Sequence, residues 1–93
     1  MNVERENIMY EIFYKKEMLE KYEYLKNTSL YADKIKHFEQ LVERSPFKNE
    51  VCKPCNDLIN FKYVEFDENV TIQYYIDEKD ESVNVYLIDI KRM

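Results

Sequence analysis

The stretch NVTIQYYIDEKDESVNVYLIDIKR, residues 69–92, decides the fold. Two runs rich in β-branched and aromatic residues, 70–77 and 83–91, flank the polar EKDES at 78–82. Runs of this composition, bounded by turn residues, are typical of strands joined in a hairpin. The sequence therefore predicts that the domain closes with two paired strands.

The second run carries apolar side chains at both alternating sets of positions. One set is Val83, Val85 and Leu87, and the other is Tyr86, Ile88 and Ile90. Successive side chains of a strand point to opposite faces, so this pattern predicts an interior strand that is covered at least partly on both sides.

Upstream of the hairpin, FKYVEF at 61–66 predicts a third strand, joined to it by DEN at 67–69. The chain contains no glycine, so Asn69 is the natural residue to adopt a positive φ in that turn. Residues 46–60 contain both prolines of the chain and are expected to form a loop.

A helix precedes this loop, in NTSLYADKIKHFEQLVERSP at 27–46. Thr28 or Ser29 can cap its start, and Pro46 ends it just after Ser45. Its apolar face repeats at helical spacing through Tyr31, Ile35, Phe38 and Leu41 or Val42.

The N-terminal segment has two interpretations. Residues 4–27 are rich in Glu, Lys, Met and Leu, and one long helix would fit this composition. IMYEIFY at 8–14 alternates like a strand, however, and the KKE at 15–17 interrupts the apolar helical set. We favour a strand at 8–14 followed by a helix at about 16–27. The order β-α-α-β-β-β predicts an α+β fold, with a helical hairpin packed on a mostly antiparallel four-stranded sheet in one domain, 1–93.

Composition narrows the function. Without glycine, neither a phosphate-binding P-loop nor a dinucleotide-binding turn can form. No apolar run approaches the roughly 18 residues that span a bilayer, and the N-terminus does not resemble a signal peptide, so we expect a cytoplasmic protein without a membrane partner. The net charge is −5, and residues 61–93 carry eight acids and four bases. This excess of acids repels phosphate.

The two cysteines, Cys52 and Cys55, have the C-x-P-C spacing of a redox pair or half a zinc site. A redox motif of this kind directly follows a strand, and no strand is predicted before Cys52. A zinc site needs four ligands, and the two thiols and His37, the chain's only histidine, supply three. We predict no metal, no cofactor and no disulfide under reducing conditions, with Cys55 buried as a small hydrophobe and Cys52 a free thiol. His37 is expected to be a partly exposed surface residue.

Several stretches resemble the RelE/ParE toxin superfamily. YEIFYKKEMLEKYEYLKN looks like its opening strand and first helix, FEQLVERSPF like its second helix, and NVTIQYYIDEKDESVNVYLIDIKR like its closing hairpin. The resemblance covers nearly the whole chain. It implies a small toxin neutralised by an antitoxin, as a hetero-oligomer with it or as a homodimer. The targets that it implies are ribosome-bound mRNA in the RelE branch and DNA gyrase in the ParE branch.

The sequence departs from the family where an RNA-cleaving site would lie. The basic residue that RelE-type nucleases carry near the start of the penultimate strand is replaced by Thr71. RNA cleavage needs proton-transfer groups and positive charge around the phosphorane. Tyr75 or Tyr86 can supply stacking or a hydroxyl group. The candidate site residues are Lys53, Lys62, Lys91, Arg92 and Tyr75. The three cations on or after the strands, Lys62, Lys91 and Arg92, are expected to share one concave region.

Whether the chain is an endoribonuclease or a binding toxin stays open at this point. A second hypothesis comes from another class of protein. The acidic DEKDE at 77–81 can mimic phosphate, as in a small inhibitor from a phage or mobile element that occupies a basic surface on a nucleic-acid-binding protein of the host.

Overall fold

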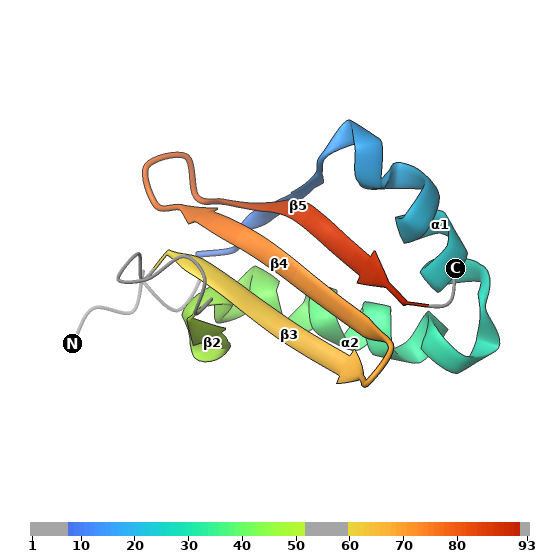
Figure 1. Ribbon diagram of the computed structural model, residues 1–93. Helices are drawn as coiled ribbons and strands as arrows, with labels where there is room; N and C mark the ends of the chain where they lie inside the picture. Colours follow the sequence, from blue (N-terminus) through green and yellow to red (C-terminus); the bar gives the residue numbers. More distant parts are fainter. Residues whose placement is uncertain (1–7, 52–59, 92–93) are drawn as a thin grey trace.

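The computed structural model describes residues 8–51 and 60–91. A five-stranded sheet forms one layer, and the helix α2 lies behind it (Figure 1). The first half of the chain contains β1 (Glu11–Tyr14), the 3-10 turn η2 (Lys16–Met18), α1 (Leu19–Asn27), α2 (Ser29–Arg44) and the 3-10 turn η3 (Pro46–Lys48). The second half contains β2 (Glu50–Val51), β3 (Phe61–Asp67), β4 (Val70–Asp77) and β5 (Ser82–Ile90).

The strands follow the order β1-β5-β4-β3-β2, with β1 parallel to β5 and the other pairs antiparallel. The predicted α+β fold and the order of its predicted elements are confirmed, and the two-residue β2 adds a fifth strand to the predicted four-stranded sheet. The first strand belongs to the same sheet as the last, although it is shorter than the predicted 8–14. The KKE at 15–17 marks the end of β1 and the start of η2, so one unbroken helix from residue 4 to 27 is excluded.

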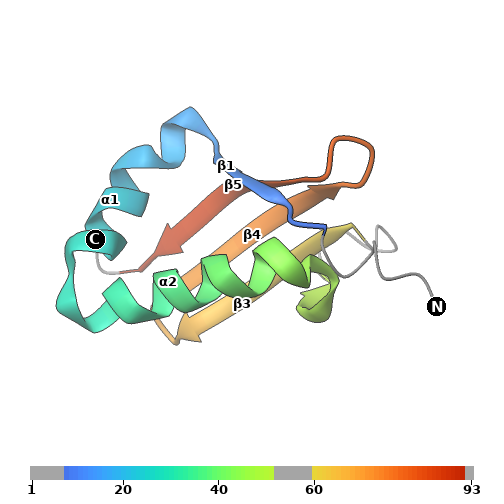
Figure 2. The ribbon, with the colours of Figure 1, turned by 180° about the vertical axis from the view of Figure 1, so that it is seen from behind.

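The core lies between the sheet and α2, which runs along the back of β3 and β4 (Figure 2). Four of the residues predicted on the apolar helix face are buried: Tyr31, Ile35, Phe38 and Val42. They pack against the inner face of the sheet, whose central members are Val70, Ile72, Tyr74, Ile76, Val83, Val85 and Ile88. In α1, Leu25 is buried, and Tyr22 stacks on Tyr14 of β1 with ring centroids 4.1 Å apart.

A β-bulge explains the two apolar faces expected for the last strand. Gln73 pairs with Leu87 but its neighbour Tyr74 pairs with Val85, so Tyr86 is an extra residue in β5. The bulge shifts the alternation by one position. Val83 and Val85 before it and Ile88 and Ile90 after it therefore share the inner face. The strand is interior, between β1 and β4, but the prediction that Leu87 shares a face with Val85 was wrong.

In both hairpin turns, which contain no glycine, an aspartate side chain accepts backbone hydrogen bonds that close the turn. The Asp67 carboxylate accepts hydrogen bonds from the backbone N–H of Asn69 and Val70, at 2.8 and 3.1 Å. Asp77 accepts equivalent bonds in the turn between β4 and β5. The prediction of a positive φ at Asn69 was wrong, because these Asx bonds close the turn without it. Among the described residues, the positive φ belongs to Glu81, at 52°.

The predicted loop at 46–60 begins with ordered structure. Pro46 starts η3 as soon as α2 has ended at Arg44. The two residues of β2 then extend the sheet beside β3. The buried Tyr74 side chain holds this segment, because its hydroxyl donates to the Pro46 carbonyl at 2.6 Å and accepts from the Asn49 amide at 2.9 Å. These bonds involve groups that a sequence pattern does not pair.

Two side chains near the helix ends make hydrogen bonds that the sequence did not predict. Thr28 stands at the N-cap of α2, yet its hydroxyl donates to the Tyr24 carbonyl of α1 and makes no capping bond. Beyond the end of β1, the Met18 sulfur of η2 accepts a hydrogen bond from the Ile88 backbone N–H.

In the described part of the chain, no helix has the length and apolar character that a membrane span needs.

Candidate binding face

The two predicted basic residues that the structure describes, Lys62 and Lys91, are not gathered in one place. Lys62 is 7% exposed and lies on the inner face opposite Tyr74, with its ammonium group 5.9 Å from the centre of the Phe47 ring. Lys91 is exposed just after β5, where its backbone N–H donates to the Asn69 carbonyl. Lys53 and Arg92 lie outside the described residues.

Lys62 and Lys91 lie at different levels along the sheet. Lys62 is level with Tyr74, just past the middle of β4, and Lys91 is level with Asn69, before the start of β4. At about 3.4 Å per residue of strand, the two positions are roughly 17 Å apart. The expected common concave region for these two lysines therefore does not form, and their catalytic roles remain predictions.

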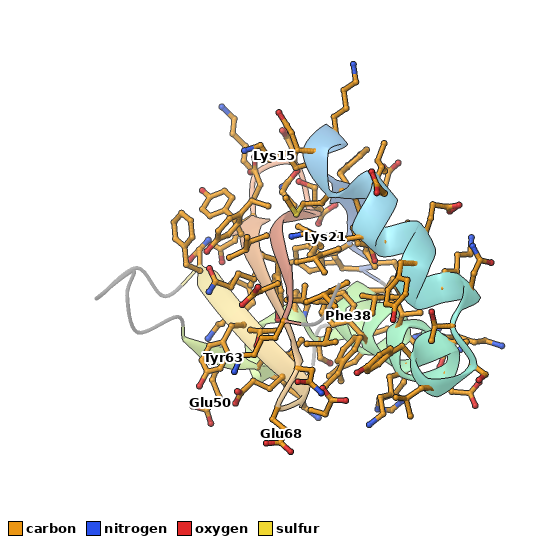
Figure 3. All side chains as sticks on the ribbon, turned by 45° about the vertical axis from the view of Figure 1, so that its right-hand side comes forward. Lys15, Lys21, Phe38, Glu50, Tyr63 and Glu68 are labelled. Atoms are coloured by element: carbon orange, nitrogen blue, oxygen red, sulfur yellow. The ribbon has the colours of Figure 1, made fainter. Side chains whose placement is uncertain are left out.

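Tyr75, the remaining predicted residue, belongs to the face of the sheet away from α2, which we call the outer face. Pairing across four strands places Phe13, Asn84, Tyr75 and Phe61 in its first row. Leu87, Gln73, Tyr63 and Glu50 form a second row, and Asp89, Thr71 and Glu65 a third. In Figure 3, Tyr63 and Glu50 lie on the side of the sheet opposite to Phe38 and the helices.

Aromatic rings contact one another across the outer face. The Phe61 and Tyr75 ring centroids are 4.8 Å apart, and Tyr86 meets Phe61 edge to face at 5.8 Å. The Tyr86 hydroxyl donates to the Gln73 side-chain oxygen at 3.2 Å, which anchors the bulge. Tyr75 remains 36% exposed and Phe13 48% exposed. The sequence named Tyr75 and Tyr86 as sources of stacking, but the contribution of Phe13 and Phe61 depends on strand pairing.

Acidic residues flank Thr71, the position at which the resemblance to RelE-type nucleases led us to expect a basic residue. Thr71 pairs with Glu65 on one side and Asp89 on the other, and both acids are exposed. Each carboxylate, about 5 Å from a phosphate held there, repels it by about 1 kcal/mol in a water-like dielectric. Of all residues in β1 to β5, Lys62 is the one lysine or arginine, and it lies on the inner face.

Hydrogen bonding at one end of the sheet holds Asp67 ionised. Its pKa is lowered, first by the Asn69 backbone N–H and next by the Tyr31 hydroxyl, which donates to it at 2.8 Å. Tyr31 belongs to α2, so this bond also fastens the helix to the turn. The carboxylate thus closes the turn, contacts α2 and carries negative charge at this corner of the sheet.

The remaining sequence candidates do not form a reactive site in the described residues. His37 is exposed, as expected, and lines a cavity of about 330 Å³ between α2 and β3, together with Leu41, Val64 and Phe66. The described residues contain no group of three His, Cys, Asp or Glu side chains that could hold a metal ion. Cys52 and Cys55 lie outside the described residues, and the prediction about them remains untested.

A known structure shares this architecture. The E. coli toxin RelE, solved as a double arginine-to-alanine mutant in the free state, matches with a TM-score of 0.67 over 90% of this chain and 85% of RelE. The chain has the RelE fold. Sequence identity is 14%, and neither the protein-family models nor the curated protein sequences match the chain. The resemblance seen in the sequence motifs is therefore confirmed as a resemblance of fold to RelE.

Proposed function

We propose that the chain is a toxin of a toxin–antitoxin module, neutralised by a partner antitoxin, and that it acts by binding its target rather than by cleaving RNA. The RelE fold over 90% of the chain supports a toxin. The single observation that carries the choice of binding over cleavage is Thr71 between Glu65 and Asp89.

Cleavage chemistry has weak support among the described residues. A phosphorane transition state needs positive charge close to its oxygens. Lys62 is on the inner face, and Lys91, two residues after Asp89, is a single cation beside the two acids of the third row. The outer face instead offers exposed aromatic surface, which is the usual material of a protein-binding hot spot. DNA gyrase, the target implied by the ParE branch, is the first protein to test.

The first experiment asks what the chain does in a bacterial host. The wild-type chain is expressed from an inducible promoter, and growth is followed. We expect growth to stop, gyrase supercoiling activity to fall in the presence of the purified protein, and no new mRNA 5′ ends to appear in primer extension. New 5′ ends on ribosome-bound mRNA would show cleavage and overturn the binding mechanism, whereas uninhibited growth would overturn the toxin itself.

Two tyrosines of similar exposure give a matched pair of variants. Tyr75→Ala removes an aromatic ring from the outer face, and Tyr24→Ala removes one from α1, where Tyr24 is 40% exposed. We expect Tyr75→Ala to relieve growth inhibition and Tyr24→Ala to leave it unchanged, with both variants folded by circular dichroism. Equal inhibition by both variants would place the functional surface elsewhere.

A second candidate is the acidic inhibitor of a host nucleic-acid-binding protein. It is favoured by the turn between β4 and β5, which exposes Glu78, Asp80 and Glu81. Burial raises the pKa of Tyr10, which directly precedes β1, and the negative charges of Glu78 and Glu81 raise it further. Changing these acids to Gln or Asn would abolish partner binding by an inhibitor and leave a toxin's growth inhibition intact.

A further inference from the structure

The outer face combines aromatic rings with acidic groups in a fixed pattern. Its first row exposes Phe13 and Tyr75 beside Phe61, and its second row adds Tyr63 and Leu87. Neither helix lies over this face in Figure 1, where α2 passes behind β3 and β4 and α1 lies beside the end of β5. The pairing of rigid strands holds the rings in place before any partner arrives, so little conformational entropy is lost on binding.

Charge on the same face has one sign within the strands. Glu50, Glu65 and Asp89 are exposed on β2, β3 and β5, and Glu11 adds a fourth acid on β1. Two described cations follow these strands directly and are exposed, Lys15 after β1 and Lys91 after β5, so the positive charge lies at the strand ends. The rings therefore lie inside an acidic rim that four different strands supply.

We propose that the outer face binds an arginine-bearing, basic segment of a partner protein. A guanidinium group stacks on aromatic faces and makes paired hydrogen bonds to carboxylates, and both partners are present within one or two rows of strand pairing. Nucleic acid and anionic membranes carry the wrong charge for this rim. The inference deepens the proposed function, on which it rests for the outer face being the binding surface, by giving the chemistry of the partner.

The test uses a display library of random 16-residue peptides, selected on the immobilised full chain at low salt. We expect the enriched peptides to carry net positive charge and at least two arginines, and to bind through the outer face. Replacing arginine by lysine in the best peptide should weaken its binding at least threefold, because lysine lacks the planar stacking group. Enrichment of neutral or acidic peptides would overturn the proposal.

Charge variants locate the site. Glu65→Gln with Asp89→Asn keeps the shape of the third row, and we expect the Kd of the best peptide to rise about tenfold and its salt dependence to weaken. Glu20→Gln with Glu23→Gln removes the same charge from exposed positions on α1 and should leave the Kd unchanged. If both pairs of substitutions raised the Kd equally, binding would depend only on the net charge of the chain, and the proposed site would be refuted. Tighter binding of a poly-uridine RNA probe than of the peptide would also overturn it.

The two proposals fail differently. Growth arrest without selection of basic peptides would overturn this inference and leave the toxin. The chain could instead select arginine-bearing peptides through Glu65 and Asp89 and yet fail to inhibit growth. That result would support the binding face and overturn the toxin.

Discussion

Removing the hydroxyl of Tyr74 tests how the segment after α2 is held to the sheet. The side chain is fully buried, and its hydroxyl donates to the Pro46 carbonyl while accepting from the Asn49 amide. Tyr74→Phe keeps the ring, which packs edge to face on Phe38 at 5.8 Å, and removes both bonds.

The magnitude follows from what each partner loses. Pro46 is buried, so its carbonyl stays without water and without a donor, at a cost of about 1–3 kcal/mol. Asn49 is half-buried and regains water, which adds less than about 1 kcal/mol. We expect the free energy of unfolding to fall by about 2–3 kcal/mol, equivalent to a drop in Tm of roughly 10–20 °C for a domain of this size.

Urea unfolding followed by far-ultraviolet circular dichroism measures the change, with an unchanged m value as the sign that the native fold is kept. The matched control is Tyr75→Phe, one residue further along β4, where the side chain is 36% exposed on the outer face. That variant should differ from the wild type by less than about 0.5 kcal/mol. A Tyr74→Phe protein as stable as the control would refute the claim that these two hydrogen bonds hold η3 and β2 in place.

Three further predictions concern pH and the thiols. Burial raises the pKa of Tyr74 to about 12, above its ordinary 10.0, so its stabilising contribution is complete below pH 10 and is lost as the pH rises towards 12. Unfolding measurements over that range should show a loss of about 2–3 kcal/mol that Tyr74→Phe lacks. Asp67→Ala should lower the Tm at pH 7, and by less at pH 2. The pKa of Asp67 is lowered in the folded state, so its contribution to stability is present above about pH 4 and disappears as acid protonates the carboxylate. Equal losses at both pH values would contradict this. Replacing both Cys52 and Cys55 with Ser should leave folding and growth inhibition unchanged, and zinc bound stoichiometrically by the wild type but not by this variant would refute it.

The order of elements was predictable because each element carries its own periodic signal. The KKE at 15–17 separates an alternating run from a helical one, and that local break distinguished β1 and α1 from a single helix. Pro46 similarly fixes the end of α2, since the residue before a proline avoids helical geometry. Signals of this kind depend on neighbouring residues alone.

The faces of the strands were harder to predict, because they depend on pairing. In β3, both alternating sets contain aromatic residues, with Phe61 and Tyr63 in one and Phe66 in the other. Pairing of Val64 with the buried Ile72 decides which set turns inward and carries Lys62 with it. The bulge at Tyr86 is likewise a property of two strands together, and so the composition of the outer face was not accessible from spacing in one strand.

The parallel pairing of β1 with β5 joins segments from the two ends of the sequence at one edge of the sheet. Glu11 is opposite Ser82, so almost the whole chain must be synthesised before this ladder can close. Pairings between residues so distant in sequence form slowly, because a long loop must be closed before the first contact forms. A ribosome that stalls before β5 has released neither the interior strand nor the Asp89 that completes the outer face. Folding of the binding surface is therefore tied to completion of translation, and shortened chains are expected to lack it altogether.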